Sequence, residues 1–177
     1  MPPKKLEDTA YHEAGHAVAR YLLGLRINHV TIIPEEGMLG HCDGGKGRRT
    51  FHPDINLNLR QRDYLEREVI STLAGGTAER RFGGQPNLKG SESDLHAAVD
   101  LASYVHGGGE LLDAYVNYLW ACAAAMWQVE WQWLAVKVLA AELLARRRIG
   151  GRKAREVIRG ACHHDRIFLK KRPANSD

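Results

Sequence analysis

The first residues that could carry out chemistry stand near the start of the chain, in the segment YHEAGHAVARYLLG. His12 and His16 are four residues apart, so on a helix their rings lie on one face and can bind the same divalent cation. Glu13 lies about 100° further round the helix, where its carboxylate can take a proton from a water bound to that cation. The pattern predicts a metal site, with one Zn²⁺ per chain as the expected ion, that activates water to attack a carbonyl group.

Tetrahedral zinc that keeps one position for water needs a third protein ligand. The position six residues beyond the second histidine is Leu22, which cannot serve. Asp94 and Glu79 are the candidates: Asp94 follows an irregular segment at the start of an expected helix, and Glu79 follows the pair Gly75–Gly76, where two helices can pack closely. One of them would bind the metal, and the other could orient a histidine. Spacing alone does not decide between them.

The elements that must position these residues are mostly helices. Apolar periodicity, capping residues and glycine stops predict six helices and three short strands. We expect Gly75–Gly76 either to break the second helix or to let another backbone approach it. The expected helices cover residues 8–24, 56–82, 91–106, 111–128, 131–148 and 152–162, and the expected strands cover 28–34, 38–42 and 48–52.

This pattern predicts an α+β fold that is mostly α-helical, with a small sheet near the N-terminus. We expect a single domain over residues 1–165 and a flexible C-terminal tail over residues 166–177. With 177 residues, 44% of them hydrophobic and 26% charged, the chain has the composition of a soluble globular domain.

Three scattered cysteines and the absence of an apolar leader segment predict a reduced, cytoplasmic protein. The most apolar stretch, residues 114–129, is shorter than the ~20 residues that span a bilayer, so we expect no membrane association. Much of the net charge of +4 comes from ARRRIGGRKAR and LKKRP. A phosphate-binding surface could form there, but solvated helix ends are the commoner outcome, so nucleic acid is not an expected partner.

Five blocks of the sequence occur in an order typical of one known family, and they are HEAGHA at 12–17, VTIIP at 30–34, LGH at 39–41, LAGGTAERRFG at 73–83 and GSESDLHAAVDLA at 90–102. Through these blocks the sequence resembles the peptidase domain of the FtsH-type (AAA) ATP-dependent zinc metalloproteases. The basic segment LAVKVLAAELLARRRIGGRKAREVI resembles the end of that domain more weakly.

The resemblance implies a zincin-like fold and a set of site residues. It implies that His12, His16 and Asp94 are the zinc ligands and that Glu13 is the catalytic glutamate. Glu79 matches a glutamate near the site of that family, so the resemblance gives it a supporting role outside the ligand set.

The resemblance also implies that the segment MLGH borders the substrate cleft. Leu39, Gly40 and His41 would then contact an extended peptide that adds to the sheet as a further strand. No Gly-x-x-x-x-Gly-Lys-Ser/Thr phosphate loop occurs in the sequence, so we expect this chain to lack the ATPase and membrane modules of FtsH.

Two functions follow from these observations. The first is a zinc-dependent endopeptidase that cuts flexible or unfolded polypeptides, either as a homo-oligomer or with a separate ATPase or adaptor. The alternative is a catalytically silent metal-binding module, derived from such a protease, that regulates or docks a partner. A nucleic-acid-binding domain based on the basic C-terminal helices is a third and weaker hypothesis.

Overall fold

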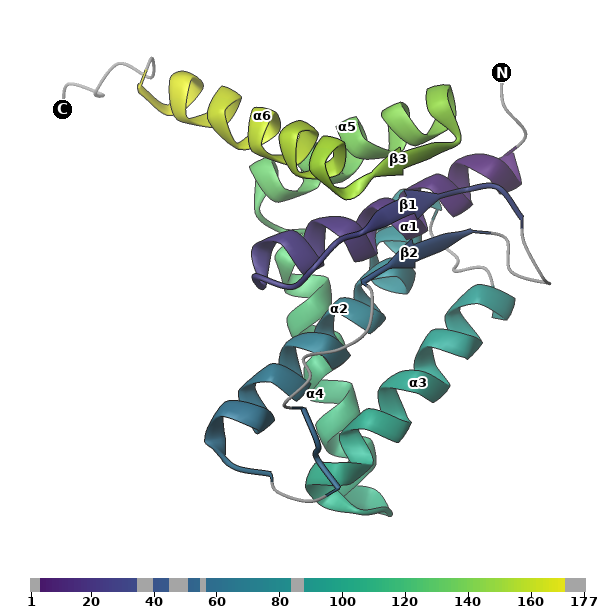
Figure 1. Ribbon diagram of the computed structural model, residues 1–177, viewed down its shortest axis with the longest axis vertical. Helices are drawn as coiled ribbons and strands as arrows, with labels where there is room; N and C mark the ends of the chain where they lie inside the picture. The colour runs from purple at the N-terminus through teal and green to yellow at the C-terminus, as the bar shows by residue number, and fades with distance from the viewer. Residues whose placement is uncertain (1–3, 35–39, 45–50, 55–56, 84–87, 171–177) are drawn as a thin grey trace, which may run out of the picture.

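The computed structural model describes residues 4–34, 40–44, 51–54, 57–83 and 88–170 (Figure 1). Over these residues the protein is mostly helical with a small antiparallel sheet, which confirms the predicted fold class. The elements in chain order are α1 (Lys4–Leu22), β1 (His29–Thr31), β2 (His41–Asp43), α2 (Leu59–Gly83), α3 (Leu88–His106), α4 (Glu110–Met126), α5 (Glu130–Arg146), β3 (Arg148–Gly150) and α6 (Gly151–Lys170).

The three strands form one antiparallel sheet in the order β2-β1-β3. Val30 at the centre of β1 is opposite Cys42 on one side and Ile149 on the other. The sheet lies beside α1, with α6 next to β3 (Figure 1). β2 is therefore an edge strand on the side of the sheet away from α6.

Helix α1 is the centre of the fold because its apolar face is made of small residues. Ala10, Ala14 and Ala17 are fully buried, and α1 packs against both α2 and α5. A Cβ atom added to Gly15 would lie 2.6 Å from Cβ of Ala78, so the backbones of α1 and α2 come into close contact there. This contact brings the histidine face of α1 directly onto α2.

The pair Gly75–Gly76 does not break α2, which continues through it to Gly83. Both glycines are buried, so the pair allows the close approach of α1 and is not a hinge. Of the two interpretations that the sequence left open, close approach is the correct one.

The third strand differs from the prediction. Residues 48–50 lie outside the described part of the chain, and Phe51 and His52 are not in a strand. The third strand is instead β3, within a segment expected to end a helix. Arg147, with φ of 66°, ends α5, and Ile149 is the one buried residue of β3, so this three-residue strand has too little alternation to be recognised.

Helix α3 carries Asp94 to the face of α1 that holds His12 and His16. It packs against α2 and α4, and its Ala98 and Ala102 are fully buried. α3 begins before the expected start at residue 91, and α6 extends beyond residue 162. Whether residues 166–177 form a tail outside a single domain stays a prediction.

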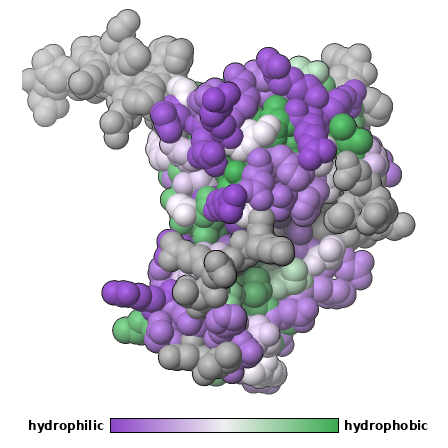
Figure 2. Space-filling model, in the orientation of Figure 1, coloured by the Kyte–Doolittle hydropathy of each residue, from purple (hydrophilic) through white to green (hydrophobic). Residues whose placement is uncertain are grey.

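The surface over α5, β3 and α6 is largely hydrophilic on the face shown in Figure 2. The exposed residues of this segment of the chain include five basic side chains: Arg146, Arg147, Arg148, Arg152 and Lys153. Among the described helices, none combines the length and the apolar character needed to cross a membrane.

Candidate metal centre

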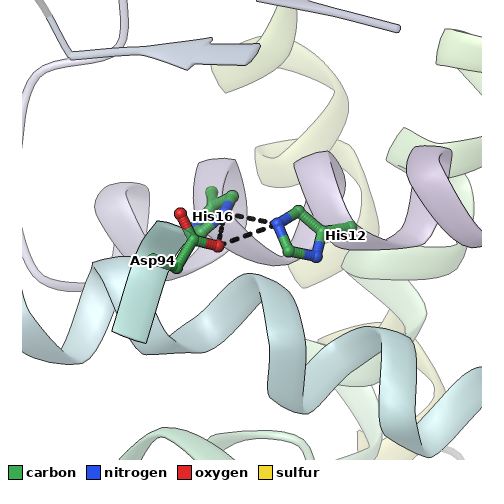
Figure 3. Close-up of side chains that lie close together, drawn as sticks. All are labelled: His12, His16 and Asp94. Carbon is green, nitrogen blue, oxygen red and sulfur yellow. Dashed lines mark hydrogen bonds and ion pairs between the residues drawn. The ribbon is translucent and has the colours of Figure 1, made fainter. Parts of the chain in front are cut away.

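Three side chains from two helices meet with their ligand atoms close together (Figure 3). The Nε2 atoms of His12 and His16 are 3.0 Å apart. Oδ2 of Asp94 lies 2.9 Å from Nε2 of His12 and 3.1 Å from Nε2 of His16. Among the described residues, this is the one group of three or more potential ligands close enough to hold a metal ion.

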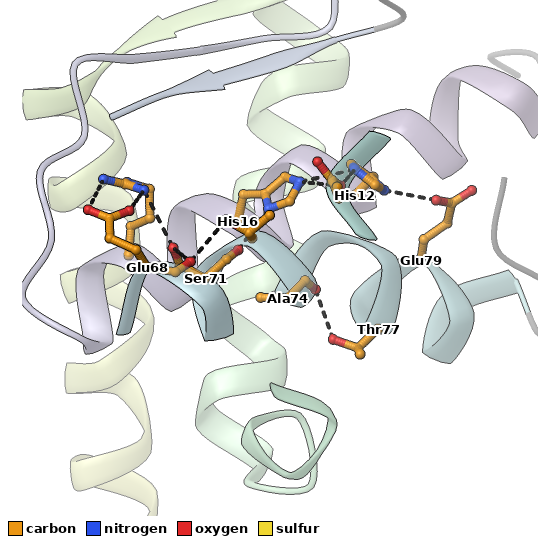
Figure 4. Close-up of polar contacts among 10 residues, drawn as sticks. His12, His16, Glu68, Ser71, Ala74, Thr77 and Glu79 are labelled. Atoms are coloured by element: carbon orange, nitrogen blue, oxygen red, sulfur yellow. Dashed lines mark hydrogen bonds and ion pairs between the residues drawn. The ribbon is translucent and has the colours of Figure 1, made fainter. Parts of the chain in front are cut away.

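The other nitrogen of each ring contacts an oxygen on α2 (Figure 4). Nδ1 of His12 lies 2.9 Å from Oε2 of Glu79, and Nδ1 of His16 lies 2.8 Å from the carbonyl oxygen of Ser71. A carbonyl oxygen only accepts hydrogen bonds, so Nδ1 of His16 must carry the proton, and the buried carboxylate of Glu79 favours the same tautomer in His12. In both neutral rings, Nε2 is therefore the atom with the free lone pair.

This donor set fits a zinc ion. Two imidazole nitrogens with free lone pairs and one carboxylate oxygen converge, and each histidine is oriented through its other nitrogen, as is usual for metal-binding histidines. Of the two acids that the spacing left open, Asp94 joins the pair of Nε2 atoms. Glu79, whose exposed fraction is 1%, instead contacts the far side of the His12 ring.

The hydrogen bonds and charges around His12, His16 and Asp94 favour a positive charge at the point where the three side chains meet. Burial alone would lower the pKa of His12, but its hydrogen bonds with Asp94 and Glu79 outweigh burial and raise the pKa to about 10. Burial would also raise the pKa of Asp94, but the charge of His16 and the bonds to both histidines lower it well below its usual range. Protons and a divalent cation therefore compete for the same space.

Glu13 is buried beside this group without being part of it. Its exposed fraction is 5%, and burial raises the pKa of its carboxyl group. Oε2 of Glu13 receives no hydrogen bond from the described part of the chain. A carboxylate with an unused acceptor atom and a raised pKa, close to a metal site, is suited to take up and release a proton.

Gly75 makes room for the ring of His16. A Cβ atom at this position would overlap the imidazole, with Nε2 as the nearest atom. The ring therefore lies directly over the backbone of α2. The glycine pair in the sequence indicated a close approach, but it did not reveal that the approaching group would be a site histidine.

The residues expected to contact substrate have different outcomes. Leu39 lies outside the described residues. A Cβ atom on Gly40 would be 2.8 Å from Oε1 of Glu13, so the backbone just before β2 lies against this glutamate. His41 is exposed at the start of β2. Their contact with substrate stays a prediction.

Ser71 is the residue that sequence reasoning missed. Its contribution to the site is a backbone carbonyl, which any residue type supplies, so its side chain gives no signal in the sequence. Its position one turn before Gly75 on α2, opposite the second histidine, could be recognised only after the packing of α1 on α2 was known.

Comparisons with known proteins found one family model and several similar proteins. The family model described as peptidase family M41 matches residues 1–106, which include all the residues of the group in Figure 3. Proteins named ATP-dependent zinc metalloprotease FtsH are similar to the chain. The protein from Trieres chinensis is 33% identical over 106 residues, or 55% of this chain, and that from Haemophilus influenzae is 33% identical over 105 residues, or 58% of it.

The similarity covers a small part of each relative. The protein from Helicobacter felis is 35% identical over 103 residues, which are 57% of this chain and 15% of the relative. The matches to the other two proteins likewise cover 15% of their lengths. The family match nevertheless extends over more than half of this chain, so the chain belongs to peptidase family M41.

Proposed function

We propose that this chain is a zinc-dependent endopeptidase in which His12, His16 and Asp94 hold one Zn²⁺ and Glu13 is the general base. The observation that carries the proposal is the convergence of two Nε2 atoms and one carboxylate oxygen within 3.1 Å of each other, while both Nδ1 atoms contact oxygens of α2. Glu79 and the carbonyl of Ser71 would fix the ring orientations.

When bound, zinc would supply a water of lowered pKa and would polarise the scissile carbonyl. The protein's own contribution is proton transfer by Glu13. Its Oε2 takes a proton from water as the oxygen–carbon bond forms, and it returns that proton to the amide nitrogen as the carbon–nitrogen bond breaks. Burial raises the pKa of this carboxyl group, which strengthens it as the base that takes up the proton.

The substrate we propose is an extended polypeptide. β2 is one of the two edge strands of the sheet in the described part of the chain, and the backbone at Gly40 lies against Glu13, so a peptide paired along β2 would pass close to the base. Only a segment without its own secondary structure can pair in this way, which favours flexible or unfolded substrates. The relatives are named ATP-dependent, and we propose that a separate ATPase or adaptor delivers substrate to this chain. We also propose that the chain acts in the cytoplasm and that it can form a homo-oligomer.

The test is Glu13→Gln, which keeps the size of the side chain and removes its basicity. We expect the variant to bind zinc like the wild type and to cleave unfolded casein about 10²–10⁴-fold more slowly. Glu142→Gln, which changes a half-buried α5 residue that pairs with Arg146 and contacts none of the site residues, is the matched control and should cleave at the wild-type rate. Full activity of Glu13→Gln would contradict the mechanism, and a zinc-loaded wild type that cleaves no polypeptide would favour the silent metal-binding module.

A further inference from the structure

A third polar residue, Arg20, continues the histidine face of α1. It follows His16 by four residues, so it lies on the same side of the helix. Each of the three residues contacts α2 at a successively earlier position, as expected for two antiparallel helices. The first two contacts along α1 are His12 to Glu79 and His16 to Ser71 (Figure 4). The third is Arg20 to Glu68.

The Arg20 side chain donates several hydrogen bonds at the interface between α1 and α2. Its Nη1 lies 2.8 Å from Oε2 of Glu68, and its Nε donates to the carbonyl oxygen of Arg26 at 2.7 Å. Glu68 also accepts a 2.6 Å hydrogen bond from the hydroxyl group of Tyr64. The side chains of Arg20 and Glu68 are only 12% and 16% exposed, so solvent screens this pair much less than a surface pair.

The pair is linked to the orientation of His16 through one residue. Nη1 of Arg20 also approaches Oγ of Ser71 at 3.4 Å, and the same Ser71 hydroxyl donates to the backbone carbonyl of Glu68 at 2.9 Å. The carbonyl oxygen of Ser71 is the acceptor for Nδ1 of His16. The guanidinium group therefore contacts the residue that orients the second histidine.

The guanidinium group also contacts the chain that follows β2. A Cβ atom on Gly44 would overlap it, so the backbone of Gly44 lies directly against Arg20. One side chain thus connects α1, α2 and the end of the edge strand.

We propose that Arg20 and Glu68 are positioning residues for the metal centre. They fix α1 along α2 so that the Ser71 carbonyl stays opposite Nδ1 of His16, which keeps Nε2 of His16 directed at Nε2 of His12 and at Asp94. The inference rests on the proposed zinc site, and neither residue touches the metal or the substrate in this scheme.

The test is the double variant Arg20→Met/Glu68→Leu, which removes the pair without leaving one buried charge unpaired. Replacing both partners of a buried ion pair by apolar residues often leaves the fold stable. We expect a cooperative thermal transition close to that of the wild type, together with a zinc affinity about 10–100-fold weaker, the usual effect of losing support behind a ligand. In the zinc-free variant, the Nδ1 proton of His16 should exchange faster with solvent in NMR spectra.

The matched control is Arg146→Met/Glu142→Leu, which removes a 2.7 Å ion pair near the C-terminal end of α5 whose side chains are 59% and 30% exposed. It should retain wild-type zinc affinity and the wild-type His16 proton signal. If Arg20→Met/Glu68→Leu does not fold, Arg20→Lys keeps the charge but not the fork of donors, and we expect a folded protein whose zinc affinity is reduced.

Wild-type zinc affinity and an unchanged His16 proton signal in a folded Arg20 variant would overturn the inference and leave the zinc site intact. Failure of the wild type to bind zinc would instead overturn the proposed function. In that case, the His16 proton signal of the zinc-free protein still tests whether Arg20 and Glu68 position the ring.

Discussion

At the scale of single residues, the same functional group has different roles because its neighbours differ. Glu13 and Glu79 are both buried acids. Oε2 of Glu79 contacts Nδ1 of His12, whereas Oε2 of Glu13 is buried without a hydrogen bond from the described residues. The motif predicts Glu13 as the base. Spacing alone could not separate Glu79 from Asp94 as a ligand, because the choice depends on which helix reaches Nε2, and only the family resemblance favoured Asp94.

Zinc affinity should increase with pH. Burial lowers the pKa of His12, but its hydrogen bonds with Asp94 and Glu79 outweigh burial and raise the pKa to about 10. At neutral pH without metal, the ring is therefore an imidazolium with a proton on Nδ1 and a second proton on Nε2. Zinc must displace that proton, and the proton competes more strongly as the pH falls below the raised pKa. We expect the affinity to rise about tenfold per pH unit for each proton displaced.

Competition with a chromogenic chelator at pH 6.5, 7.5 and 8.5 measures this dependence. Arg146→Met, which changes an exposed residue of α5, should show the same slope as the wild type and controls for general charge effects. An affinity that is constant across this range would mean that the imidazoles do not bind the ion.

At the scale of secondary-structure elements, apolar periodicity in the sequence predicts where the helices lie but not which helices contact one another. The helix with His12 and His16 was evident from its small apolar residues and its glycine stop. The role of Gly75–Gly76 was ambiguous, because a glycine pair can end a helix or let a neighbour approach. The backbone acceptor at Ser71 and the short strand β3 gave no usable signal, since neither depends on a run of characteristic side chains.

Gly75→Ala should disrupt the site from within α2. The new methyl group would overlap the ring of His16, which has no room to move toward the α2 backbone. We expect zinc affinity to fall at least tenfold, with a loss of about 1–3 kcal/mol in the free energy of unfolding from overpacking. Isothermal titration and urea denaturation measure the two effects.

Gly160→Ala is the control for helix propensity. Gly160 lies exposed within α6, and an added Cβ atom would meet no atom within 4 Å. Alanine there should stabilise the protein by about 0.5–1 kcal/mol and leave zinc binding unchanged. Equal zinc affinity in both variants would show that the ring of His16 does not depend on the absence of a side chain at residue 75.

At the scale of the whole molecule, the proposed site joins helices that are far apart in the sequence. His12 is on α1, Asp94 on α3 and Glu79 on α2, so the ligands come together only in the folded chain. The motif predicts the two histidines, and the family resemblance predicts Asp94 as the third ligand. The packing of α3 against α2 and α4, which sets the position of Asp94, could not be read from periodicity.

Zinc should therefore stabilise the entire fold. A ligand that binds only the native state adds about 4 kcal/mol at a concentration 1,000 times its Kd, which for a chain of this size corresponds to a rise of about 10 °C in Tm. Thermal unfolding with zinc and with a chelator measures this shift. His12→Ala should lose the shift and His96→Ala, an exposed histidine of α3, should keep it; an equal shift in both variants would place the stabilising ion elsewhere.

The most direct measurement of the central claim is a crystal structure of the zinc-loaded protein, with anomalous diffraction recorded at the zinc absorption edge. The account predicts one strong anomalous peak per chain, bonded to Nε2 of His12, Nε2 of His16 and a carboxylate oxygen of Asp94. A peak with other ligands, or no zinc bound beside these three residues, would contradict it.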